Sequence, residues 1–208
     1  MGRPGRSRAD AYPTLSRGGT MGRMGKILYH SSTSLDGYIA DRQGKFDFSV
    51  PDDEVHAFVN DLQRDVGTYL FGRNLYEVMA VWETWDTTAE PAVVQDFARI
   101  WHGIDKVVYS TTLPAASTAR TRIERTFDPE TVRGLKAGTD RSIGIGGPTL
   151  AAAAFRAGLV DECSLFVTPC VIGGGKKYLP DGLNLRLELL EEHTFGSGTV
   201  YLRYRVLP

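Results

Sequence analysis

Short apolar runs alternate with segments of helical spacing through most of the chain, and this alternation limits the possible folds more than any other feature. Strands are predicted at residues 26–34, 68–72, 106–111, 121–127, 142–147 and 162–175. Helices are predicted at residues 51–67, 73–82, 92–104, 128–138 and 148–159. Strands that alternate with helices are typical of an α/β fold whose central sheet is mostly parallel.

The last apolar segment breaks this alternation. Residues 185–207 carry two strand-like runs joined by Gly196-Ser197-Gly198, without a helix between them. Two such runs joined by a glycine turn predict an antiparallel hairpin. We therefore expect a mostly parallel mixed sheet flanked by helices, with a C-terminal antiparallel hairpin, in a single domain over residues 25–208.

The first 24 residues differ in composition from the rest. They contain five arginines, five glycines and one acidic residue, and they lack the hydrophobic segment of a secretory signal. We expect a disordered tail over residues 1–24, and both Met21 and Met24 are plausible starts.

Charge and cysteine content argue against several classes of protein. The formal net charge is -1, so no global field favours nucleic acid or an anionic membrane surface. No apolar stretch approaches the length of a membrane span. Cys163 and Cys170 are too few for a disulfide framework or a cysteine-based zinc site. The four histidines are scattered and no hydrolase or metalloprotease motif occurs. We expect a cytoplasmic protein without a metal site.

The glycine run at the end of the 142–147 strand is the first candidate for ligand binding. Gly146 and Gly147 lie between a predicted strand and a helix that begins with Pro148 and Thr149. The free amides and the dipole of a helix N-terminus favour a phosphate there. A simple tight turn, with proline at its favoured first helical position, explains the same residues equally well. The run fails the dinucleotide fingerprint because Thr149 stands where the last glycine belongs.

Two further strand ends carry polar groups. Arg73 follows Gly72 at the start of a predicted helix, where a guanidinium can bind a phosphate. Ser110 and Thr111 follow the 106–111 strand and can bond a phosphate or a ribose. Each signal is weak alone, since surface arginines and Ser-Thr loops are common.

The remaining candidates have equally ordinary explanations. Asp36 lies in the turn pair Asp36-Gly37, where aspartate is usually structural. Trp82 and Trp85 can form an aromatic wall for a flat heterocycle, or they can pack in the core.

Taken in order, these segments resemble the dihydrofolate reductase superfamily. The closer similarity is to the reductase domain of bifunctional riboflavin-biosynthesis proteins and to the small stand-alone proteins related to it. The motifs that carry the resemblance are SLDGYIA (34–40), LFGRNLYE (70–77), VVYST (107–111), IGIGGPTL (143–150) and VDECSLFVTPCVIGGGKKYLP (160–180). The resemblance covers residues 25–208, and the deaminase half of the bifunctional enzymes is absent.

The resemblance implies an eight-stranded sheet with NADPH bound across the strand ends. It implies that the following residues bind the cofactor: Ser32, Ile39, Gly72, Arg73, Asn74, Leu75, Ser110, Thr111, Gly146, Gly147, Pro148, Thr149 and Leu150. On the substrate side it implies Ser31 and Thr168, and we place Trp82 and Trp85 there as well.

One position departs from dihydrofolate reductases. These enzymes place an acid on the first helix, where an ungapped count from Gly72 puts His56 here. Glu54 reaches that position only with a shift of the alignment, and Asp36 matches an aspartate near the substrate in the riboflavin branch. Asp36 and Glu54 are therefore the candidate catalytic acids.

These observations predict an NADPH-dependent reductase that transfers a hydride to a C=N or C=O bond of a small heterocyclic substrate. One alternative is a nucleotide-binding protein without turnover, such as a sensor or interaction module. Another is a true dihydrofolate reductase. The resemblance also implies a homodimer, because relatives of this branch are often dimers, sometimes through edge strands, and the closing hairpin offers such an edge.

Overall fold

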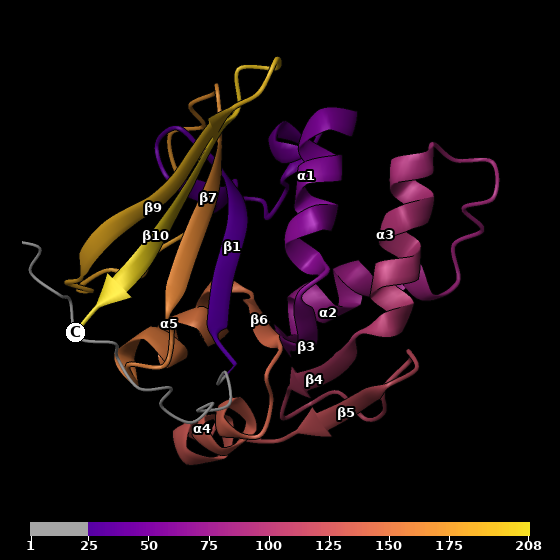
Figure 1. Ribbon diagram of the computed structural model, residues 1–208, viewed down its shortest axis with the longest axis vertical. Coiled ribbons are helices and arrows are strands. Elements are labelled where there is room, and N and C mark those ends of the chain that lie inside the picture. Colours follow the sequence, from indigo (N-terminus) through magenta and orange to yellow (C-terminus); the bar gives the residue numbers. More distant parts are fainter. Residues whose placement is uncertain (1–24) are drawn as a thin grey trace, which may run out of the picture.

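A computed structural model describes residues 25–208 of the chain (Figure 1). The disordered tail predicted for residues 1–24 lies outside the described residues. The main strands are β1 (Ile27–Ser34), β3 (Val66–Gly72), β4 (Asp105–Tyr109), β5 (Thr121–Glu124), β6 (Ser142–Gly146), β7 (Glu162–Thr168), β9 (Arg186–Thr194) and β10 (Val200–Leu207). They form one eight-stranded sheet in the order β5-β4-β3-β6-β1-β7-β10-β9.

The pairing confirms the predicted mostly parallel sheet with an antiparallel hairpin at one edge. β1 is parallel to β6 and β7, β3 is parallel to β4 and β6, and β4 is parallel to β5. β10 is antiparallel to both β7 and β9. Gly198, with φ of 83°, allows the tight turn between β9 and β10.

Helices cover both faces of the sheet (Figure 1). They are α1 (Asp53–Gln63), α2 (Arg73–Met79), α3 (Ala92–Gly103), α4 (Pro129–Ala137) and α5 (Pro148–Arg156), with short 3-10 turns η1 (Asp47–Ser49) and η2 (Ala80–Glu83). α4 and α5 pack on one face against residues such as Tyr29, Leu70 and Ile143. α1, α2 and α3 cover the other face, where Phe71 and Phe166 are buried. Alternate residues of β3 thus enter different cores, as expected for a strand.

Several predicted elements end earlier than their patterns suggest. The helix predicted at 51–67 ends at Gln63, because Val66 and Gly67 already belong to β3. The strand predicted at 162–175 stops at Thr168, because Pro169 has no amide hydrogen for the ladder. The helix predicted at 73–82 becomes the 3-10 turn η2 after Met79.

A second, two-stranded sheet lies beside the first. β2 (Tyr38–Ala40) pairs antiparallel with β8 (Lys176–Lys177) and holds the loop after β1 against the loop after β7. Gly173, Gly174 and Gly175 all have positive φ values in this second loop. A Cβ on Gly175 would overlap the carbonyl oxygen of Ala40, so this close approach requires glycine.

Candidate cofactor and substrate site

The carboxyl ends of three neighbouring strands meet at one edge of the sheet. Phe71 of β3 pairs with Gly146 of β6, and Gly72 pairs with Tyr109 of β4. A Cβ on Gly147 would lie 3.9 Å from the backbone nitrogen of Gly72. The structure therefore brings together the two glycine turns that the sequence singled out separately.

The two helices that begin at these turns have no side-chain cap. Gly72 precedes α2, and Gly147, with φ of 90°, precedes α5. By contrast, the carboxylate of Asp52 accepts an amide hydrogen of α1, and that of Asp128 accepts two of α4. The amides in the first turns of α2 and α5 thus lack a side-chain acceptor, which suits an anionic ligand.

Gly144 and Gly146 are required for a different reason than the one inferred from the sequence. The ring of Tyr69 lies over both glycines, and a Cβ on either residue would overlap it or the side chain of Leu75. Tyr69 stacks in turn on Phe71 with ring centroids 4.4 Å apart. Packing against protein side chains therefore requires glycine at both positions of β6, whether or not a ligand binds. Gly147 is required by its backbone conformation.

Arg73 connects the start of α2 to the loop after β4. Its Nη1 donates to Thr112 Oγ1 at 2.6 Å, and its Nε donates to Glu77 Oε1 at 2.7 Å. The side chain is 44% exposed, so it is open to a ligand at the surface of this edge. Thr112 was not predicted as a site residue, although it directly follows the predicted pair Ser110-Thr111.

The loop after β4 uses Ser110 for its own folding. Ser110 Oγ accepts the amide hydrogens of Thr112 and Leu113, and the residue is buried. Arg125 Nη1 donates to the carbonyl oxygens of Ser110 and Leu113. Thr111 is exposed. Arg125 was also not predicted as a site residue, because it lies inside the strand predicted at residues 121–127 and gave no separate signal there.

Asp36 fastens the loop after β1 to the loop after β7. Its two carboxylate oxygens accept the amide hydrogens of Ile172, at 3.2 Å, and Gly173, at 2.8 Å. The Ser34 hydroxyl and these amides hold the pKa of Asp36 below its usual range. The carboxylate is thus an acceptor at neutral pH, and this geometry favours a structural role for it. Its catalytic role stays a prediction.

Glu54 is also engaged with a backbone amide. Its Oε2 accepts the amide hydrogen of Gly196 at 3.0 Å, which connects α1 to the turn between β9 and β10. Neither candidate acid is therefore a free carboxyl group in this structure.

The predicted substrate residues lie in two environments. Ser31 Oγ donates to the carbonyl oxygen of Ser32, and buried Thr168 donates to that of Thr33. Trp82 packs among other aromatic side chains. Its ring centroid is 4.6 Å from that of Phe97 on α3 and 5.1 Å from that of Trp85. Trp82 thus has a packing role, and Trp85, 39% exposed, reaches the surface.

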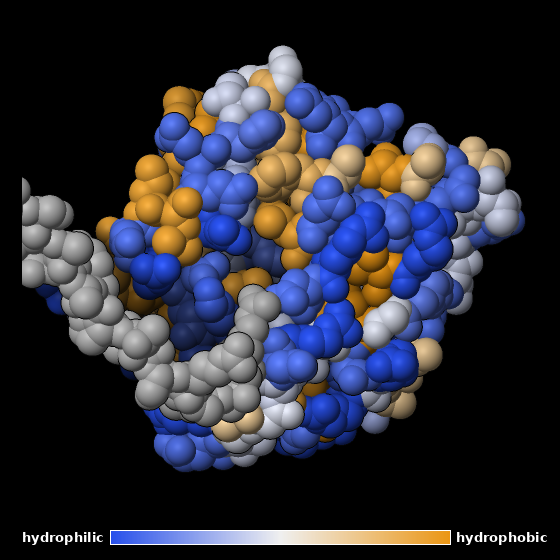
Figure 2. All heavy atoms as spheres, in the orientation of Figure 1, coloured by the Kyte–Doolittle hydropathy of each residue, from blue (hydrophilic) through white to orange (hydrophobic). Residues whose placement is uncertain are grey.

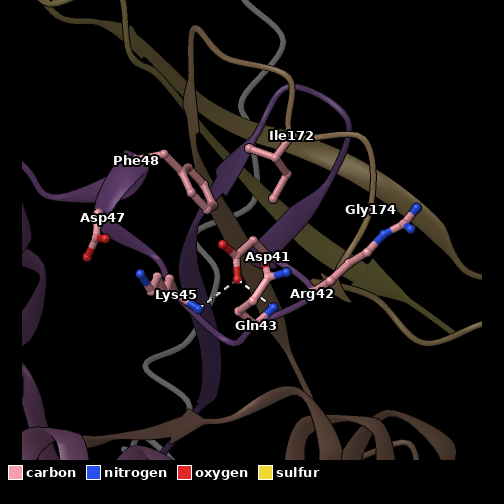
Figure 3. A pocket seen from close by; sticks show the side chains of 8 residues that line it. All are labelled: Asp41, Arg42, Gln43, Lys45, Asp47, Phe48, Ile172 and Gly174. Carbon is pink, nitrogen blue, oxygen red and sulfur yellow. Dashed lines mark hydrogen bonds between the residues drawn. The ribbon is translucent and has the colours of Figure 1, made fainter.

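Figures 2 and 3 show a surface depression and a pocket. Figure 2 shows a depression near the middle of the face, between β1 and the α1–α2 part of the chain in Figure 1. A pocket of about 460 Å³ lies between the segment that follows β2 and the loop after β7 (Figure 3). Its lining residues are Asp41, Arg42, Gln43, Lys45, Asp47, Phe48, Ile172 and Gly174. None of the predicted site residues lines this pocket.

Residues 25–208 contain neither a metal-binding cluster nor a membrane-spanning helix. No group of three or more His, Cys, Asp or Glu side chains there is arranged to hold a metal ion. Over the same part of the chain, no helix is long and apolar enough to cross a membrane.

Sequence comparison identifies relatives of the whole described region. The profile of the RibD C-terminal domain family matches residues 25–201. A curated relative, the uncharacterized protein YyaP of Bacillus subtilis (strain 168), is 26% identical over 181 residues, which cover 86% of this chain and 94% of that protein.

Solved structures share the fold at low sequence identity. A putative riboflavin biosynthesis protein from Shewanella sp. PV-4 has a TM-score of 0.69 at 20% identity, covering 88% of this chain and 99% of that one. The Thermotoga maritima diaminohydroxyphosphoribosylaminopyrimidine deaminase/5-amino-6-(5-phosphoribosylamino)uracil reductase has a TM-score of 0.61 at 13% identity, covering 88% and 57%. Enterococcus faecalis dihydrofolate reductase, in complex with NADP(H) and RAB-propyl, has a TM-score of 0.61 at 13% identity, covering 89% and 98%.

We predict that Gly146→Ala destabilises the protein by about 1–3 kcal/mol, because the new methyl group must displace Leu75 or Tyr69 from a packed position. Urea unfolding measures this change. Gly134→Ala, at a helical position where an added Cβ meets nothing within 4 Å, is the matched control. Equal stability of the two variants would contradict the packing explanation.

We predict that Asp36→Asn loosens the loop after β7, because the amide replaces one of two carboxylate acceptors. Hydrogen exchange at Ile172 and Gly173 should become faster. In the native protein these bonds should persist at neutral pH and be lost only as the pH falls through the lowered pKa of Asp36, since protonation removes the carboxylate acceptor. Unchanged exchange in the variant would show that Asp36 does not hold the two loops together.

Proposed function

Because the chain belongs to the RibD C-terminal domain family, we propose that it is an oxidoreductase that transfers a hydride from NADPH to a C=N or C=O bond of a small heterocyclic substrate. The observation that carries this proposal is the edge where Gly72 and Gly147 approach each other. Two uncapped helix N-termini and one arginine side chain there offer several donors to a polyanion.

The edge fits a dinucleotide phosphate in three respects. The Gly147 turn needs a positive φ, which glycine supplies. The missing side-chain caps leave amide donors for phosphate oxygens. Arg73 is held by Thr112 beside the loop after β4, at the place proposed for the 2′-phosphate of NADPH. The Enterococcus faecalis dihydrofolate reductase, which has a similar fold, was solved with NADP(H).

We assign the cofactor contacts along this edge in the order implied by the family resemblance. Gly146, Gly147, Pro148, Thr149 and Leu150 would hold the pyrophosphate. Ser32 and Ile39 would lie near the nicotinamide. The phosphate groups would also contact the stretch Gly72, Arg73, Asn74 and Leu75, with Thr112 added to the predicted Ser110 and Thr111.

When bound, NADPH would supply the hydride, and the residues of this chain would orient the two reactants and exclude water. Asp36, through Ile172 and Gly173, would fix the loop that borders the substrate side. We keep Glu54 as a candidate acid only if its bond to Gly196 opens when substrate binds.

The substrate proposal rests on the names of related proteins. The Thermotoga maritima protein is named as a reductase of a phosphoribosylaminouracil, and the Shewanella protein as a putative riboflavin biosynthesis protein. We propose that the substrate is a planar nitrogen heterocycle of that kind and that the enzyme is cytoplasmic. We also propose a homodimer through β9, an edge strand on which Leu187 and Leu189 are 38% and 49% exposed.

One observation favours a second candidate, a nucleotide-binding protein without turnover. The side chains of Asp36 and Glu54 both accept backbone amide hydrogens, so both candidate acids already have partners within the protein. A screen of pterins, aminouracils and imines for NADPH oxidation separates the two functions. Tight NADPH binding without turnover on any of them would favour the binding protein.

We predict that the protein binds NADPH more tightly than NADH and that Arg73→Ala removes most of this preference. A lost charge-assisted contact to the 2′-phosphate should weaken NADPH binding by roughly 10-fold, which corresponds to about 1.4 kcal/mol. Fluorescence titration of both cofactors measures it. Arg99→Ala, which alters an exposed arginine on α3, is the matched control.

NADH binding should be almost unchanged in Arg73→Ala, because NADH has no 2′-phosphate. Equal, weak binding of both cofactors to the native protein would contradict the proposed cofactor.

A further inference from the structure

A polar cluster lies beneath the glycine edge on the side of α1. His30 of β1, Gln63 of α1 and Tyr69 of β3 form it, and we call these three residues the His30 cluster. The amide Nε2 of Gln63 is in short hydrogen-bond contact with His30 Nε2, and Tyr69 Oη lies 3.5 Å from the same nitrogen. No residue of this cluster was a predicted site residue.

The orientation of the Gln63 amide decides which imidazole nitrogen carries the proton. In the orientation of the structure, Gln63 Nε2 donates and His30 Nε2 accepts, which leaves the hydrogen on Nδ1. Burial also lowers the pKa of His30 to about 4, with no charged neighbour contributing, so the imidazole is neutral at physiological pH. His30 is thus a neutral donor with a defined tautomer.

The other imidazole nitrogen, Nδ1, forms no hydrogen bond within residues 25–208, where the contacts of the ring are at Nε2. The His30 side chain is only half-buried. Nδ1 is therefore the imidazole nitrogen that remains for a ligand, since Nε2 already contacts Gln63 and Tyr69.

The cluster also lies at the proposed reaction end of the site. His30 and Ser32 are two residues apart on β1, so their side chains leave the same face of the sheet. Ser32 is a residue proposed to lie near the nicotinamide. The Tyr69 ring, which contacts His30, covers the glycines directly before the Gly147 turn.

A second atom of the cluster points to a polar ligand or to water. Gln63 is 5% exposed, and its Oε1 is buried without a hydrogen-bond partner. Leaving a buried acceptor unpaired costs roughly 1–3 kcal/mol, so such an atom normally has a partner. An N–H group or a bridging water would satisfy it.

Resting on the proposed function, we propose that His30 is a substrate-binding residue whose Nδ1–H donates to the carbonyl oxygen or imine nitrogen of a planar heterocycle during hydride transfer. Gln63 and Tyr69 are positioning residues, since both hold Nε2 and so aim Nδ1. The heteroatom becomes more negative as the hydride reaches the adjacent carbon, so this hydrogen bond strengthens in the transition state. His30 keeps its proton, and the substrate takes one from water.

Steady-state kinetics test the role, with the substrate that turns over in the NADPH-oxidation screen. His30→Leu should lower kcat by roughly 100-fold, as expected for the loss of one preorganised donor, and leave NADPH affinity unchanged. His30→Asn, which restores an N–H donor, should recover part of the loss. Tyr69→Phe should show a smaller decrease. His102→Asn, on exposed α3, is the control.

The pH profile separates this role from that of a charged acid. A neutral donor predicts a rate that does not titrate with His30 between pH 5.5 and 8, and a loss confined to pH near its pKa of about 4. A kcat of His30→Leu equal to that of the native protein would overturn the proposal. So would a native rate that changes with a histidine pKa near neutrality, if that pH dependence disappears in His30→Asn.

A spectroscopic measurement tests the placement without turnover. In protein labelled with ¹⁵N in histidine, the His30 signals should show the Nδ1–H tautomer and should move when 5,6-diaminouracil is added. They should also move in Tyr69→Phe. His30 signals that stay unchanged both on addition of 5,6-diaminouracil and in Tyr69→Phe would overturn the proposal, even if NADPH binds. If NADPH does not bind but the signals respond to the aminouracil, the proposed cofactor fails and the role of His30 in ligand binding survives.

Discussion

The contact of the Tyr69 ring with the glycines of β6 is the constraint on which the candidate site depends. Since the ring lies over Gly144 and Gly146, β3 and β6 can pair in register only when both β6 positions lack a side chain. That register places the ends of the two strands side by side. Gly72 and Gly147 then approach each other, and α2 and α5 begin next to one another with their first amides uncapped. The same tyrosine reaches His30, so one side chain connects the glycine edge to the His30 cluster.

The two candidate acids stabilise the walls of the site. Asp36 binds the amides of the loop after β7, and Glu54 binds an amide of the β9–β10 turn. The bonds to Asp36 hold its pKa below its usual range, so this carboxylate is a poor proton donor. The groups that remain for binding are mostly neutral or cationic: backbone amides, Arg73 and the imidazole of His30. This set of groups suits a reaction in which a cofactor supplies the reactive group. The protein then orients the reactants and stabilises developing charge.

Much of the fold follows from local sequence signals, and less of the site does. Alternating apolar runs and helical spacing predict the elements of the sheet, and the Gly196–Gly198 turn predicts the closing hairpin. Pro169 ends β7 earlier than the apolar pattern suggests, which a stricter use of proline would have anticipated. The sequence also singles out Gly146, and the structure adds a packing reason for a glycine there: a Cβ would overlap Leu75 and Tyr69, which lie 71 and 77 residues earlier in the chain. Such long-range contacts leave no local pattern. For the same reason Thr112, Arg125 and the His30 cluster were not predicted, because their partners come from different strands and helices.

A crystal structure of the protein with NADPH tests the central claim most directly. The account predicts the pyrophosphate at the start of α5, within hydrogen-bond distance of the amides that follow Gly147. It predicts the 2′-phosphate beside Arg73 and Thr112, and the nicotinamide over the face of β1 that carries Ser32 and His30. NADPH bound instead in the pocket between Phe48 and Ile172, or no ordered cofactor at saturating concentration, would contradict it.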